Sequence, residues 1–139
     1  MNVPFSPLTR DTVNTVSASL QERFNAWIDK ALSKPVPESI IAFSFNLAEP
    51  WCVELVGADN YSDDDSDWAC PPEAFRAKIK KFGFPESEVG STWQPVLESA
   101  KSMVSAYLNR PSPGSDRLQK AVAVVVGFVD GDLCKVWPG

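Results

Sequence analysis

Residues 121–137, AVAVVVGFVDGDLCKVW, contain the pattern that decides the predicted fold. A β-branched, apolar run (121–129) is followed by Asp130-Gly131 and then by a second run (132–137). Asp-Gly between two such runs is typical of a two-residue type I′ hairpin. Both faces of the first run are apolar, which indicates a central strand covered on both sides. The predicted register pairs Phe128 with Leu133, Val126 with Lys135 and Val124 with Trp137.

A second hairpin is predicted upstream. In residues 39–47, large apolar side chains alternate with small or polar ones, which is the period of a strand with one apolar face. Residues 51–57 continue as a second strand, and the short link Ala48-Glu49-Pro50 favours a direct return of the chain.

The remaining segments predict helices. Apolar residues at spacings of three and four predict a helix over 7–33, begun by Ser6-Pro7, and a short one over 72–82. Ser91 and Gln94 fit a capping box at the start of a third helix, and residues 109–115 form a turn-rich connection. The predicted fold class is α+β, with a mostly antiparallel sheet from two hairpins, helices packed on it, and a single domain over 1–139.

Composition excludes several classes of function. The chain has 139 residues, a net charge of −5 and no histidine. The net negative charge argues against a nucleic-acid partner. Because histidine is absent, catalysis by histidine and metal ligation by histidine are both excluded. No apolar run is long enough to span a bilayer and no secretory signal is visible, so we expect a cytoplasmic protein without a membrane partner. The three cysteines form no CxxC motif, which favours reduced thiols.

The acidity is concentrated in one region. No lysine or arginine lies between Pro35 and Phe75, whereas nine acidic residues do. Three interpretations of residues 59–67 compete: a solvated loop, a docking surface for a basic protein, and a cation site. The aspartates 63, 65 and 67 have the opening spacing of an EF-hand loop. Trp68 replaces its glycine and Ala74 its bidentate glutamate, so no metal site is assigned.

Aromatic residues flank the aspartates. Tyr61 and Trp68 resemble the large rings that anchor protein interfaces, although Trp68 also suits a core position that pins the loop to the sheet. The basic residues Arg76, Lys78, Lys80 and Lys81 follow directly, and they are positioned to neutralise part of the charge of the aspartates within the fold.

Nothing in the sequence selects a catalytic constellation or a cofactor. A carboxylate-dependent hydrolase, using for example Glu54 with Asp67, is one alternative, and a ligand- or cation-binding module is another. Cys52 and Cys134 suit small buried hydrophobic positions, and there is no glycine-rich phosphate loop. We therefore predict that the protein is not an enzyme.

Four segments together resemble a known group of proteins. They are residues 43–49, FSFNLAE; 54–57, ELVG; 65–70, DSDWAC; and 127–133, GFVDGDL. In this order they are similar to small acidic bacterial immunity proteins of polymorphic-toxin and contact-dependent competition systems. Pro50 and the pair Pro71-Pro72 depart from that pattern. The resemblance implies a protein that binds one cognate toxin and blocks it, without catalytic groups.

The predicted function is stoichiometric binding and inhibition of a cognate bacterial toxin through an acidic surface. A basic toxin such as a nuclease would fit, because aspartates can occupy the place of phosphates in a cationic cleft. The predicted partner-binding residues are Glu54, Asp59, Tyr61, Asp63, Asp64, Asp65 and Asp67.

Overall fold

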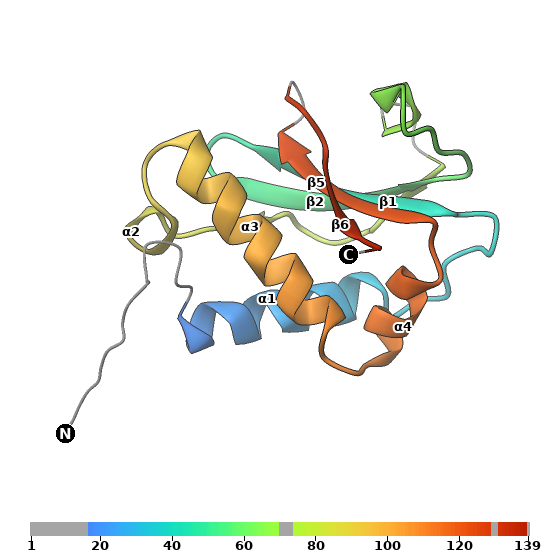
Figure 1. The fold of residues 1–139 in the computed structure, drawn as a ribbon. Coiled ribbons are helices and arrows are strands. Elements are labelled where there is room, and N and C mark those ends of the chain that lie inside the picture. Colours follow the sequence, from blue (N-terminus) through green and yellow to red (C-terminus); the bar gives the residue numbers. More distant parts are fainter. Residues whose placement is uncertain (1–16, 70–73, 129–130, 139) are drawn as a thin grey trace.

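The computed structural model describes residues 17–69, 74–128 and 131–138. The helices are α1 (Ala18–Ala31), α2 (Glu86–Val89), α3 (Trp93–Leu108) and α4 (Pro113–Gln119), with a 3₁₀ helix η1 (Ser66–Ala69). The strands are β1 (Ala42–Ala48), β2 (Cys52–Ala58), β3 (Phe75–Arg76), β4 (Phe82–Gly83), β5 (Ala123–Phe128) and β6 (Cys134–Trp137). The chain therefore has the predicted α+β composition (Figure 1).

The six strands form one mixed, mostly antiparallel sheet in the order β3-β2-β1-β5-β6, with β4 also paired to β2. Both predicted hairpins are present, as the antiparallel pairs β1–β2 and β5–β6. They are joined side by side through β1 and β5, which run parallel with Ala42 opposite Ala123. This parallel pair places a strand of each hairpin in the centre of the sheet, where both are buried.

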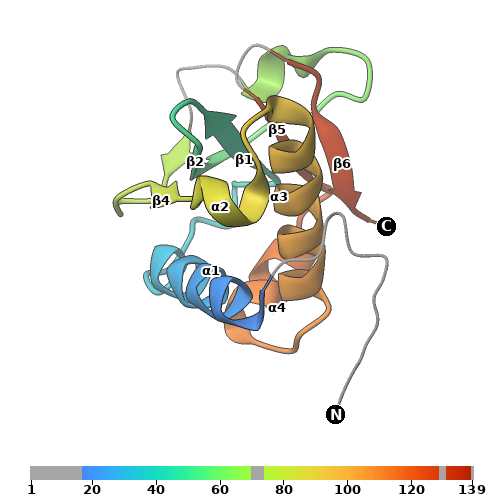
Figure 2. The same ribbon diagram turned by 90° about the vertical axis from the view of Figure 1, so that its left-hand side faces the viewer.

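Both faces of the sheet are covered. The large apolar residues of β1, Phe43, Phe45 and Leu47, are fully buried in the main core with α1 and α3. The small residues of β1 face the other way, and Ala42 and Ser44 are fully buried as well. Figure 1 shows α1 and α4 below the sheet and η1 above it, and Figure 2 shows α3 alongside β6. The segment around η1 therefore forms the second covering layer.

The predicted register of the C-terminal hairpin is confirmed at one end of the strand pair and wrong at the other. Val124 lies opposite Trp137 as predicted, but Val126 lies opposite Cys134 and not Lys135. A β-bulge between Val124 and Val125 inserts one extra residue on β6, which shifts the pairing by one position. Leu133 precedes β6 and forms no ladder pair with Phe128. Asp130, on which the predicted turn type depends, lies outside the described residues.

The prediction of a helix over 72–82 is wrong. Its described part is extended, and Phe75 and Phe82 form the short strands β3 and β4 along the outer edge of β2. Phe75 lies opposite Gly57, and Phe82 lies opposite Val53. The edge of β2 offers unpaired backbone groups to this segment, and that tertiary pairing outweighs the helical spacing of its apolar residues.

The helix boundaries differ from those predicted. Ser17 is the N-cap of α1, its Oγ accepting from the Leu20 N–H at 3.1 Å, while the predicted start at Ser6-Pro7 lies outside the described residues. Thr92, not Ser91, precedes α3, so the predicted capping box is wrong. Part of the predicted connection 109–115 is helical, because Ser112 caps α4 and Pro113 opens it.

Candidate functional site

Trp68 fastens the acidic loop, residues 59–69, to the second face of the sheet. Its side chain is 9% exposed and packs with Ala42, Ala58 and Val125. The Tyr61 ring lies edge-on to the Trp68 ring, with centroids 5.1 Å apart. The core role of Trp68 is therefore confirmed, and Tyr61 is half-buried against it. The rings hold the loop in place while its aspartates lie at the surface.

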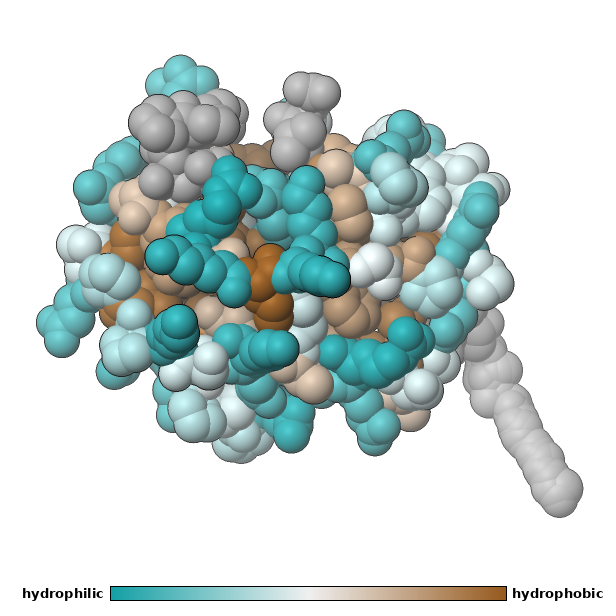
Figure 3. Space-filling model, turned by 180° about the vertical axis from the view of Figure 1, so that it is seen from behind, coloured by the Kyte–Doolittle hydropathy of each residue, from teal (hydrophilic) through white to brown (hydrophobic). Residues whose placement is uncertain are grey.

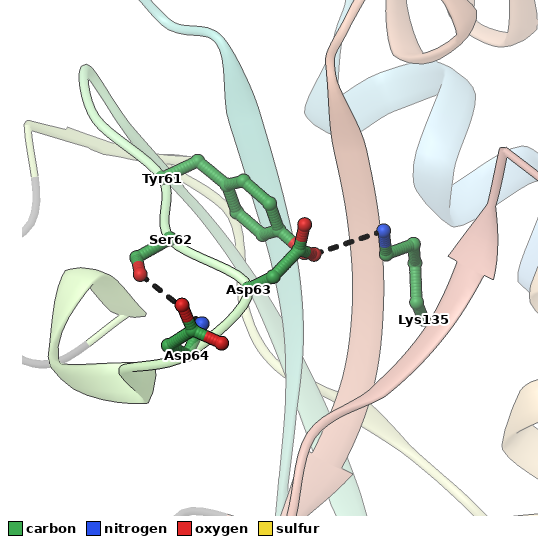
Figure 4. A network of polar contacts seen from close by, with 5 residues as sticks. All are labelled: Tyr61, Ser62, Asp63, Asp64 and Lys135. Carbon is green, nitrogen blue, oxygen red and sulfur yellow. Dashed lines mark hydrogen bonds and ion pairs between the residues drawn. The ribbon is translucent and has the colours of Figure 1, made fainter.

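A network of three side chains joins this loop to β6 (Figure 4). The Tyr61 hydroxyl donates to Asp63 Oδ1 at 2.5 Å, and the Lys135 ammonium donates to the same oxygen at 3.1 Å. The ammonium also lies 5.5 Å from the centroid of the Tyr61 ring, in cation–π range. One carboxylate oxygen thus accepts two hydrogen bonds, one of them from a cation.

The network shifts the pKa of each member. The hydrogen bond from Tyr61, followed by that from Lys135, lowers the pKa of the Asp63 carboxyl below its ordinary value. The hydrogen bond to Asp63 raises the pKa of the Tyr61 hydroxyl and that of the Lys135 ammonium. Near neutral pH the arrangement therefore favours ionised Asp63, protonated Lys135 and a neutral phenol.

The other predicted aspartates of the loop have no basic partner among the described residues. Asp59, Asp64, Asp65 and Asp67 are exposed, and their recorded contacts are local. Asp65 Oδ1 accepts from the Asp67 N–H at 2.9 Å, and the Asp64 N–H donates to Ser62 Oγ at 3.1 Å. These bonds shape the loop, and they leave the four negative charges uncompensated by lysine or arginine.

Glu54 is separate from this group. It lies on β2, and its carboxylate forms an ion pair with Arg76 on β3. The sequence predicts neutralisation of the aspartates by the basic residues 76–81, but the ion pair that the structure shows for this cluster is with Glu54. Lys78, Lys80 and Lys81 are exposed. Figure 3 shows the side of the molecule that carries β3 and β4, where hydrophilic side chains surround a smaller hydrophobic area.

A hollow of about 390 Å³ lies between the acidic loop and the C-terminal hairpin. Of the predicted site residues, Tyr61, Asp63, Asp64 and Asp65 line it, together with Asp132, Leu133 and Lys135, which the sequence analysis did not select. Asp59, Asp67 and Glu54 do not line it. The missed residues come from the other hairpin, and no local signal connects them to the loop.

The described part of the chain offers little for other chemistry. No group of three or more potential ligands there is placed to hold a metal ion. Cys52 and Cys134 are free thiols and half-buried, less buried than predicted, and Cys70 lies outside the described residues. No described helix has the length and apolar character that a membrane span requires.

Comparison with known proteins found no matching protein family, no similar curated sequence and no similar solved structure. The resemblance to immunity proteins therefore stays a prediction, and the geometry of the acidic loop is what bears on function.

Proposed function

We propose that the protein acts by stoichiometric binding, as an immunity-like inhibitor that neutralises a basic toxin through the acidic loop. The observation that carries this proposal is the contrast within the loop. Asp63 is paired to Lys135, whereas Asp59, Asp64, Asp65 and Asp67 are exposed and have no basic partner among the described residues. Charges left uncompensated on a loop that is held by a buried ring are available to a cationic partner.

The anchoring supports recognition. A mobile loop would lose conformational entropy when it binds, but Trp68 and the Tyr61–Asp63–Lys135 network already order residues 61–68. The carboxylates of Asp64, Asp65 and Asp67 in this range, with that of Asp59 directly after β2, would accelerate encounter with a positive surface, and the gain would fall as salt is added. A nuclease is the toxin class that fits best, because its substrate path attracts phosphates.

The test begins with the partner. The protein is used to capture its partner from its host, and the partner's toxic activity is measured as the protein is added. We expect inhibition to be complete at a fixed molar ratio. A captured partner whose activity is unchanged by an equimolar amount of the protein would contradict the inhibitory function.

Charge reversal then tests the surface. The variant D59K/D64K/D67K removes aspartates for which the described residues supply no basic partner, and it spares Asp63, whose reversal would oppose Lys135. The control E22K/E49K/E86K makes the same net change at exposed positions outside the loop that form no ion pair with a described residue. At low salt we expect the loop variant to slow association at least about tenfold, with a smaller effect of the control. Equal effects of the two variants would exclude the loop as the docking site.

Calorimetry with calcium addresses the cation-binding alternative. Saturable heat that is abolished in D59K/D64K/D67K would favour a cation module over an inhibitor.

A further inference from the structure

A second hollow, opposite in charge to the acidic loop, lies where the segment after α1 meets α4. Its volume is about 530 Å³, within the range of small-molecule sites. Three basic side chains line it, from Lys34, Arg117 and Lys120, against the single carboxylate of Glu38. The protein as a whole carries a net charge of −5, so this is a local reversal of its charge.

Arg117 is held in a fixed position. Its Nη2 donates to the carbonyls of Pro37 at 2.8 Å and Ile40 at 3.0 Å, and its guanidinium carbon lies 5.2 Å from the centroid of the Phe43 ring. A guanidinium has five N–H donors, and these two bonds use only one of its nitrogens. Arg117 therefore presents an ordered positive charge to the hollow, and a ligand would not have to immobilise it.

The charges of the two lysines are not neutralised within the described part of the chain. Lys34 and Lys120 are exposed and form no ion pair with any described residue. Nor are they needed to satisfy the end of α4, whose carbonyls are already occupied. Those of Arg117 and Leu118 accept from backbone N–H groups, and that of Gln119 accepts from the Trp137 indole at 3.2 Å. Three cations around one hollow repel one another, and a bound anion would relieve that repulsion.

One part of the wall of the hollow is apolar. Leu32, Val36 and Ile41 are half-buried, and Ile40 is 2% exposed. We propose that this hollow binds a small organic anion, a carboxylate or phosphate monoester with a short apolar group. The headgroup would lie among Lys34, Lys120 and Arg117, and the apolar group against the wall. This proposal is independent of the acidic loop and its partner.

Phenyl phosphate and benzoate are suitable probes, with benzyl alcohol as the neutral analogue. Each is titrated into the full-length ¹⁵N-labelled protein at constant ionic strength, and amide shifts are followed by NMR. We expect at least one anion to bind about tenfold or more tightly than benzyl alcohol, with shifts concentrated in residues 32–41 and 117–122.

Variants separate a site from general charge attraction. K34Q/K120Q should weaken binding of the anion about tenfold, whereas K78Q/K80Q, with the same net change on the β3–β4 side, should leave it unchanged. Arg117 is kept, because its loss would remove the donor to the Ile40 carbonyl and one of the two donors to the Pro37 carbonyl, which also accepts from the Ile40 N–H. Anions that bind no better than benzyl alcohol, or equal weakening by the two double variants, would overturn the proposal.

Discussion

The Lys135 ammonium lies 3.1 Å from Asp63 Oδ1, although the two residues are 72 positions apart in the chain. This contact joins the acidic loop to the C-terminal hairpin across the second face of the sheet. It also separates Asp63 from the other loop aspartates, because Asp63 pairs with a cation and they pair with none in the described part of the chain. The loop thus contains one carboxylate that pairs with a lysine of β6 and others that have no basic partner among the described residues.

Tyr61→Phe should raise the pKa of the Asp63 carboxyl, because the hydrogen bond from Tyr61 is the largest cause of its lowering. An Asp pKa that is lowered by folding adds stability at pH values above the pKa of the unfolded chain, about 3.9, and this is lost as pH falls through the folded value. Carboxyl ¹³C shifts measured against pH report the change directly. Lys78→Gln is the control. An unchanged Asp63 titration in the phenylalanine variant would contradict the network.

Trp68→Ala should destabilise the fold by about 3–5 kcal/mol, because it empties the ring's place against Ala42, Ala58 and Val125. Trp93→Ala is the matched control. Trp93 is 52% exposed and makes an edge-on contact with Phe128, so its loss should cost about 1 kcal/mol or less. Urea unfolding measures both free energies. Similar losses in the two variants would contradict the anchoring role of Trp68.

Tyr107→Phe should flatten the fall in stability at alkaline pH. Burial raises the pKa of the Tyr107 hydroxyl, which donates to Asp29 Oδ1 at 2.7 Å. The unfolded phenol ionises near pH 10 while the folded one stays neutral, so this residue's contribution is present below pH 10 and is lost as pH rises further.

The measurement is the free energy of unfolding between pH 8 and 11. At pH 8 the variant should lose about 1 kcal/mol with its hydrogen bond. If wild type and variant lost stability in parallel above pH 10, ionisation of Tyr107 would not be the cause of the alkaline loss of stability.

Gly114→Ala should destabilise the junction of α3 and α4. A Cβ at residue 114 would lie 2.0 Å from the hydroxyl oxygen of Tyr107, so the ring must move, at a cost of about 1–3 kcal/mol. The cost should be smaller in a Tyr107→Phe background, which gives a measurable coupling in a double-mutant cycle. Gly83→Ala, where a Cβ meets nothing within 4 Å, is the control. Additive effects of the two substitutions would contradict the contact.

Predictions of secondary structure are confirmed where the local sequence pattern and the tertiary surroundings favour the same structure. The alternation in residues 41–47 and the Asp-Gly between two apolar runs each predicted a hairpin, and both hairpins are present. Prediction failed in residues 74–83, where helical spacing of Phe75, Ile79 and Phe82 competes with an open strand edge. An isolated segment offers no information about that edge.

The candidate site likewise combines features that the sequence predicts with contacts that only the tertiary structure shows. The concentration of aspartates in residues 59–67 and the anchoring role of Trp68 could be inferred from the chain, because charge runs and flanking rings are properties of neighbours in sequence. The pairing of Asp63 with Lys135, the ion pair of Glu54 with Arg76, and the hollow around Arg117 could not.

Local chemistry was therefore enough to specify the two hairpins, the α+β class and the place where negative charge gathers, since each depends on residues a few positions apart. The three-dimensional arrangement alone decided that β1 and β5 lie side by side and which charges are neutralised. The reason is physical: an ion pair or a parallel strand pair depends on distances between groups far apart in the chain, and those distances exist only after the core around Phe43 and Phe45 has formed.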